Sequence, residues 1–187
     1  KKLQMIATLC NNSRFLTRRD DGTVFSMVEG MKDPSLDLLR VSSTGNASDI
    51  GIIKCMQCLE DVDVYRKRYP EVFQNEFDPT NEWQQSIHQQ PGASDPLVLV
   101  LKGAPDKVIN RCQYMMLNGE RKHLTDQLKD ELVKAHAHLG GLGERVLGFA
   151  YGFASPRKNL NRTRKKQQKN RKPRSQHITS PKASPPT

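Results

Sequence analysis

The sequence contains no apolar run near the roughly 18 residues that a helix needs to cross a bilayer. Only four of its 187 residues are cysteine, too few and too scattered for the framework of a small disulfide-rich secreted protein. It also lacks the G-x-x-x-x-G-K-[ST] loop and a complete G-x-G-x-x-G pattern. We therefore expect a soluble, cytoplasmic chain without a disulfide scaffold and without a phosphate loop of these two types.

Acidic residues are missing from the C-terminal end. Residues 157–187 hold 11 of the 30 Lys and Arg, none of the 20 Asp and Glu, and no aromatic residue. The net charge of +10 therefore belongs to this end, and the preceding residues are close to neutral. We predict one folded domain over residues 1–154 and a basic, Ser/Pro-rich disordered tail over 155–187. Such a tail suits RNA, DNA or anionic lipid, and an altered splice or reading frame is the alternative origin.

Metal-ligand clusters are also absent from the sequence. Cys55 and Cys58 form a C-x-x-C pair, but no second pair or nearby histidine pair completes a zinc site. They lie in an apolar-periodic segment with Ile52, so we expect both thiols to pack in the core as small hydrophobic groups. We predict no structural metal.

The clearest apolar pattern in the sequence is a run of five apolar residues, 97–101, which predicts a buried central strand. The run ends at Lys102 and Gly103, and Pro105 is suited to the first position of a helix. A lysine, a glycine and free helix N–H groups together favour a phosphate or nucleotide. The alternative is that Lys102 extends into solvent from the strand end.

The rest of the chain predicts an α+β fold, a mainly antiparallel sheet flanked by helices. Helices are expected over residues 3–12, from an Asn46 or Ser48 cap through Leu59, over 61–68 and from a Thr125 cap to Gly140. The last helix carries an apolar stripe and an Asp130–Lys134 pair. Strands are expected over residues 23–28, 71–77, 83–88, 113–117 and 145–153, with a mostly irregular segment over 30–44.

Two motifs carry a family resemblance. The segment 102–106, Lys-Gly-Ala-Pro-Asp, resembles the Lys-Gly-Ala-Pro-Glu motif in the nucleotide-binding domain of P-type cation-transporting ATPases. Residues 140–149 are similar to the second nucleotide-site segment of that domain. Further matches are Leu9-Cys10-Asn11, residues 45–49, Phe77, Thr80-Asn81 and residues 84–88. Over residues 1–153, the chain resembles the sodium/potassium and proton/potassium pump branch, which implies the same α+β fold.

This resemblance implies an ATP site. Phe77 would stack on adenine, Lys102 and Gly103 would line the base and ribose pocket, and Arg145 would contact the phosphates. The full set that the resemblance implies is Ser48, Asp49, Phe77, Gln84, Lys102, Gly103 and Arg145. Asp49 is one methylene shorter than the family's glutamate, and Glu82 replaces a lysine, so we expect weaker ATP binding than in the relatives.

Catalytic residues are not expected in this chain. The Asp-Lys-Thr-Gly-Thr sequence that the family phosphorylates is absent, so the chain should bind ATP without hydrolysing it. By resemblance, it would be a truncated or variant cytoplasmic domain of a sodium/potassium-exchanging pump. The parent would use ATP with Mg, further domains and a beta subunit at the plasma membrane. The alternative is a non-catalytic interaction protein whose basic tail binds nucleic acid or anionic lipid.

Overall fold

The computed structural model describes residues 1–16, 27, 37–92 and 96–154. Most of the strand predicted over 23–28, residues 30–36 of the irregular segment 30–44, and the predicted tail lie outside the described residues. The domain boundary between residues 154 and 155 therefore stays a prediction.

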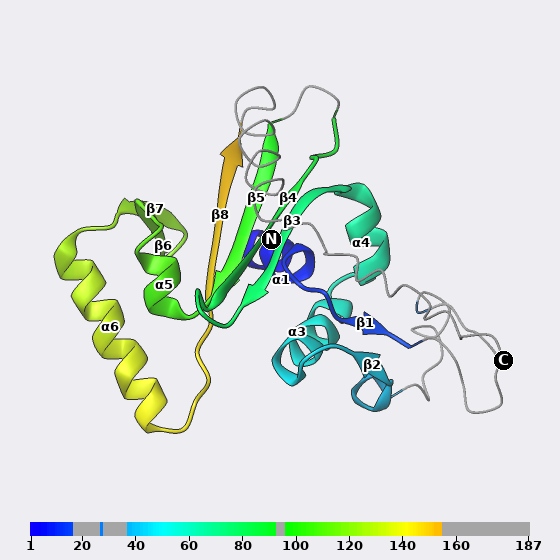
Figure 1. Ribbon diagram of the computed structural model, residues 1–187, viewed down its shortest axis with the longest axis horizontal. Coiled ribbons are helices and arrows are strands. Elements are labelled where there is room, and N and C mark those ends of the chain that lie inside the picture. The colour runs from blue at the N-terminus through cyan, green and yellow to red at the C-terminus, as the bar shows by residue number, and fades with distance from the viewer. Residues whose placement is uncertain (17–26, 28–36, 93–95, 155–187) are drawn as a thin grey trace, which may run out of the picture. The chain divides into compact units, whose positions relative to one another are not determined.

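A four-stranded antiparallel sheet forms the centre of the described structure (Figure 1). Its order is β3 (Glu71–Asp78), β4 (Trp83–His88), β5 (Leu97–Gly103) and β8 (Gly148–Ala154). The predicted central strand is β5, which lies inside the sheet and is largely buried. These strands and their flanking helices confirm the α+β class, although β8 begins at Gly148, three residues later than predicted.

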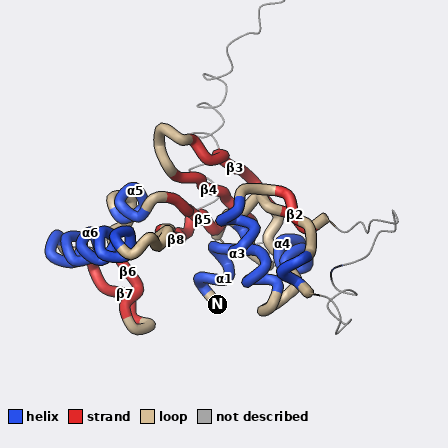
Figure 2. Tube along the Cα trace, turned by 90° about the horizontal axis from the view of Figure 1, so that it is seen from below, coloured by secondary structure: helices blue, strands red, loops and turns tan. Residues whose placement is uncertain are grey.

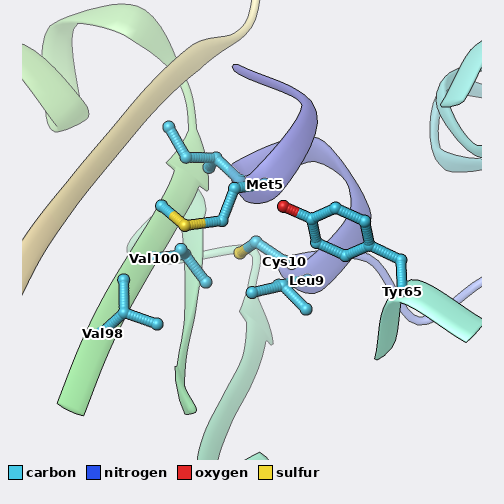
Figure 3. Close-up of a cluster of buried hydrophobic side chains, with 7 residues drawn as sticks. Met5, Leu9, Cys10, Tyr65, Val98 and Val100 are labelled. Atoms are coloured by element: carbon cyan, nitrogen blue, oxygen red, sulfur yellow. The ribbon is translucent and has the colours of Figure 1, made fainter. Parts of the chain in front are cut away.

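One face of this sheet packs against α1 (Lys2–Leu9), and we call it the α1 face. In the register, Gln84 pairs with Lys102, and Ser86 pairs with Val100, so these four side chains share a face. Figure 3 shows side chains from α1, the sheet and Tyr65 directed toward one another. This core cluster consists of Met5, Ile6, Leu9, Cys10, Tyr65, Val98 and Val100.

Two further helices lie beside α1, namely α3 (Ala47–Gln57) and α4 (Val62–Arg68) (Figure 2). The Asn46 side chain caps α3 by accepting from the backbone N–H of Asp49 at 2.9 Å. Asp61 caps α4 by accepting from the N–H of Val64 at 2.8 Å. The sequence predicted both helices and offered Asn46 as one of two caps for the first.

The prediction that Cys55 and Cys58 are core residues is wrong, because both are exposed free thiols. The buried positions of α3 are instead Asp49, Ile53, Met56 and Gln57. The apolar residues of α3 occur on most sides of the helix, so periodicity alone did not identify the side that is buried. The buried side also contains two polar residues, Asp49 and Gln57, and a search for apolar positions does not include them.

The second group of elements follows β5 along the chain. It contains α5 (Pro105–Ile109), β6 (Tyr114–Leu117), β7 (Glu120–His123) and α6 (Asp126–Gly141). As predicted, Asn118 and Gly119 turn the β6–β7 hairpin, both with positive φ. The Thr125 hydroxyl also caps α6, accepting from the N–H of Leu128 at 3.3 Å.

The predicted apolar stripe of α6 is not buried, because no residue of this helix is buried in the described structure. The expected Asp130–Lys134 ion pair is not among those of the described residues. Lys129 instead pairs with Asp126 at 3.1 Å, one turn earlier.

Four short elements had no counterpart among the predictions, and β7 is one of them. Strands β1 (Arg14–Phe15) and β2 (Ser43–Thr44) form a small antiparallel ladder, and a 3-10 turn covers Leu38–Arg40. None of the described helices is both long and apolar enough to span a bilayer.

Candidate functional site

A buried ion pair links β5 to α3. The Lys102 ammonium, at the end of β5, donates to Oδ1 of Asp49 in the first turn of α3. The two residues are only 5% and 4% exposed. Because an isolated buried charge is very costly, each group depends on the other for its burial. Two residues that the resemblance assigned to the nucleotide site are thus in direct contact, although 53 positions separate them.

Gln84 lies beside this pair, directly opposite Lys102 on β4. Its side-chain amide is buried and donates to the carbonyl oxygen of Cys10 at 3.2 Å. Burial raises the pKa of the Cys10 thiol to about 11, although the nearby Lys102 charge lowers it in part. The thiol is therefore protonated at neutral pH, and Cys10 acts as a packing residue rather than a nucleophile.

Phe77 lies at an irregular position of β3. The register shifts between Asn75 and Asp78, so that Glu76 and Phe77 together oppose the single residue Gln84. This is a β-bulge, which changes the direction of side chains locally. Phe77 is 54% exposed, so its aromatic surface is accessible to a flat ligand, one strand away from Gln84.

Gly103 allows close backbone approach at the same end of the sheet. A Cβ built on it would lie 2.4 Å from the carbonyl oxygen of Glu82 and 2.6 Å from Cβ of Trp83. The carbonyl of Glu82 also accepts from the N–H of Ala104 at 2.9 Å. Glycine is therefore required here for β4 and β5 to remain paired as far as Trp83 and Gly103.

The charge of Glu82 is partly offset by its surroundings. Its carboxylate lies 3.5 Å from the ammonium of Lys107 in α5, which also lies 3.4 Å from Asp106. The neighbouring Trp83 ring carries the Arg111 guanidinium above it, 4.7 Å from the ring centroid. The Trp83 ring is therefore already in contact with a cation, Arg111, two residues after the end of α5.

Two of the predicted site residues, Ser48 and Arg145, are located only through their neighbours in the sequence. Ser48 precedes Asp49 and is half-buried, and Arg145 is exposed three residues before Gly148, which pairs with Gly103. Neither side chain forms a hydrogen bond or ion pair within the part of the chain that the structure describes. The structure thus brings Asp49, Gln84 and Lys102 together, with Gly103 on the same strand as Lys102 and Phe77 on the neighbouring strand β3. Ser48 and Arg145 have no polar contact with this group in the described structure.

Sequence reasoning missed the residues that hold this group in place. Asn11 Nδ2 donates to the carbonyl oxygen of Asp49 at 2.9 Å, and Asn11 is itself contacted by Arg66. The Leu9-Cys10-Asn11 motif signalled this segment, but only as a family match without a role. Arg66 carried no sequence signal. Over the described ranges, no three metal-ligating side chains converge.

Comparison with known proteins identifies a family and relatives that this chain resembles in sequence. The family model for the P-type ATPase cytoplasmic domain N matches residues 1–180. The chain is 37% identical over 150 residues to the sodium/potassium-transporting ATPase subunit alpha of Tetronarce californica, and 38% identical over 151 residues to that of Drosophila melanogaster. Each match covers 80% of this chain and 13% of the relative, so the chain corresponds to a small part of those proteins.

Proposed function

This chain belongs to the family of P-type ATPase cytoplasmic N domains, and from that premise we propose that it binds ATP for a sodium/potassium-exchanging pump. The relatives are named as sodium/potassium-transporting ATPase alpha subunits. Because the chain matches only 13% of their length, ATP hydrolysis and cation exchange are proposed for a whole parent protein and not for this chain alone.

The observation that carries this proposal is the exposed Phe77 ring on β3, at the position opposite Gln84 of the buried polar group. Adenine needs an apolar surface for its face and hydrogen-bonding groups for its edge. Phe77 supplies the first, and Gln84 with the Lys102–Asp49 pair supplies polar groups on adjacent elements. This combination of residue types on neighbouring elements supports the proposal of a purine-nucleotide site.

The proposed roles follow from charge and exposure. Asp49 already neutralises Lys102, so these two groups act on the base and ribose side, together with Gly103 and Ser48. Arg145 is exposed and free to meet the phosphates with a planar, permanently charged fork. We infer that Glu82 weakens phosphate binding less than its charge alone suggests, because Lys107 lies 3.5 Å away.

We propose that the parent pump carries its phosphorylated aspartate, membrane helices and beta-subunit contacts outside this sequence. This domain would then present ATP, bound with Mg in the parent, on the cytoplasmic side of the plasma membrane. By itself the chain would act as a truncated, ATP-binding but non-hydrolysing domain over residues 1–154, followed by the basic segment 155–187.

The test is an ATP titration of the full chain, followed by calorimetry or amide chemical shifts. Base stacking on an aromatic ring contributes about 1–3 kcal/mol, so Phe77→Ala should weaken binding by about fivefold or more. Phe153→Ala is the matched control, because Phe153 is also 54% exposed but lies on β8 at the opposite edge of the sheet. Equal affinities for the two variants, or a folded chain that ignores millimolar ATP, would overturn the proposal.

The second candidate is polyanion binding by the basic segment, favoured by its 11 Lys and Arg without any Asp or Glu. Binding of this kind falls steeply with salt, because each phosphate contact releases a counterion. A chain ending at residue 154 should lose duplex RNA or anionic-vesicle binding and keep ATP binding. The same deletion therefore separates the two functions.

A further inference from the structure

The connection between α1 and β1, residues 10–13, contacts the candidate site at two points. The carbonyl oxygen of Cys10 accepts from Gln84 Nε2, and Asn11 Nδ2 donates to the carbonyl oxygen of Asp49. Asn11 Oδ1 also accepts from the N–H of Ser13 at 2.9 Å, which fixes the orientation of the Asn11 side chain. The position of this connection therefore bears on Gln84 and Asp49 together.

Arg66, in α4, holds the same connection from the other side. Its guanidinium donates to three backbone carbonyl oxygens: Thr8 at 3.2 Å, Asn11 at 2.6 Å and Ser13 at 3.0 Å. These carbonyls belong to the last turn of α1 and to the connection, where helical partners are missing. Asp63 approaches the guanidinium only at 4.0 Å, so the carbonyls are its main partners.

We propose that Arg66 is a positioning residue for the nucleotide site, acting through Asn11 on the Asp49–Lys102 pair. Arg66 fixes the α1–β1 connection, Asn11 holds the first turn of α3, and Asp49 in that turn receives the Lys102 ammonium. The effect on ATP affinity rests on the proposed function, whereas the effect on the ion pair does not.

The chemistry of the contact requires arginine. A guanidinium presents five N–H donors in a fixed fork and can reach three separate carbonyls at once. A lysine ammonium at this position concentrates its donors on one atom and cannot span the same three acceptors. Loss of the fork frees the connection and, with it, the Asn11 amide that contacts α3.

A purely stabilising role is the competing explanation, and Arg68 provides the control. It lies on the same helix, two residues later, and contacts Glu60 and the Tyr65 ring rather than the α1–β1 connection. Arg66→Met and Arg68→Met thus remove the same charge and similar side-chain volume from one helix. Only the first cuts the link to Asp49.

The experiment uses the full 187-residue chain, labelled with ¹⁵N, and follows the Asn11 side-chain amide and the Lys102 Nζ signal. Arg66→Met should shift both signals and raise the Kd for ATP by at least fivefold. Arg66→Lys should fail to restore them, and Arg68→Met should leave the signals unchanged and the Kd within twofold. The proposal is overturned if Arg66→Met lowers the unfolding temperature but leaves the Lys102 signal and the Kd as in Arg68→Met.

Two outcomes need a second variant or readout. If Arg66→Met does not fold, Asn11→Ala keeps the three carbonyl acceptors and removes the contact with α3, together with the local contact to the Ser13 N–H. An unchanged Lys102 signal in that variant contradicts the proposal. If the unaltered chain ignores ATP, the proposed function fails. The Lys102 signal in the Arg66 variants then still decides whether Arg66 positions the ion pair.

Discussion

The two groups of helices around the sheet differ in how much they bury. Helix α1 has eight residues, of which five are buried, and it shares a core with the sheet and α4. Helix α6 is twice as long, with 16 residues, and none of them is buried in the described structure. Both helices were predicted from apolar periodicity, so that pattern indicates a helix more dependably than it indicates burial.

The polar contacts are divided in the same way. The region formed by α1, α3, α4 and the α1 face contains the buried ion pair, the Gln84–Cys10 contact and the Arg66 contacts with three carbonyls. The region of α5, α6 and the β6–β7 hairpin carries exposed pairs such as Lys129–Asp126. Exposed ion pairs contribute little, so the candidate site depends on the first region for its geometry.

The sharpest way to break this contrast is to remove one partner of the buried pair. Lys102→Met leaves the Asp49 carboxylate buried without a counter-charge, which should lower the free energy of unfolding by about 3–5 kcal/mol. The double variant Asp49→Asn with Lys102→Met should recover most of that loss. Urea unfolding of the three chains measures both effects, and a double variant as unstable as the single one contradicts the argument.

A smaller effect is expected when one apolar side chain is shortened in each of the two regions. Ile53 in α3 is 0% exposed, whereas Val133 in α6 is 51% exposed. Ile53→Ala should lower the free energy of unfolding by about 3 kcal/mol through lost burial and a residual cavity. Val133→Ala should change it by less than about 0.5 kcal/mol. Similar losses for both variants would mean that Val133 is packed against other residues, and would contradict the difference in burial between α3 and α6.

The smallest expected effect is a pH dependence of the free energy of unfolding, which arises from His88 on the α1 face. His88 is buried, with its ring nitrogens 3.0 Å from the Tyr69 carbonyl oxygen and 2.8 Å from Ser86 Oγ. Burial lowers the pKa of His88 below 6.5; the Tyr69 contact raises it in part, and the Arg66 charge lowers it further. The folded chain therefore keeps His88 neutral where the unfolded chain already binds a proton.

Stability from His88 is thus present above pH 6.5 and is lost as the pH falls below it. Between pH 6.5 and 5.5 the loss is at most about 1.4 kcal/mol, because one proton over one pH unit is worth that much. Urea unfolding at pH 7.5 and 5.5 should show a smaller decrease for His88→Gln than for the unaltered chain. An identical decrease in both chains would remove His88 as the cause.

The predicted elements that the structure confirms are those with strong local signals. The apolar run before Lys102 became β5, and the Asn118-Gly119 turn, the Thr125 cap and Pro105 at a helix start all lie where predicted. Each depends on residues a few positions apart. The thiols of Cys55 and Cys58 were misplaced because choosing the buried side of α3 depends on what packs against it.

The candidate site was predicted only as a set of residue types, through family motifs. That Asp49 would pair with Lys102, and that Gln84 would hold Cys10, depends on α3 and α1 lying against one end of the sheet. Nothing in the sequence pattern marked Arg66 as the residue that joins them.

By itself, the sequence determined the longer helices and strands, several caps and turns, the concentration of basic charge after residue 156, and the family. The tertiary structure alone decided which charges are buried together, which thiols are exposed and which arginine supports the site. The physical reason is range: propensity, capping and periodicity act between neighbours along the chain. Burial and ion pairing depend on how separate elements pack, here across 53 positions for Asp49 and Lys102.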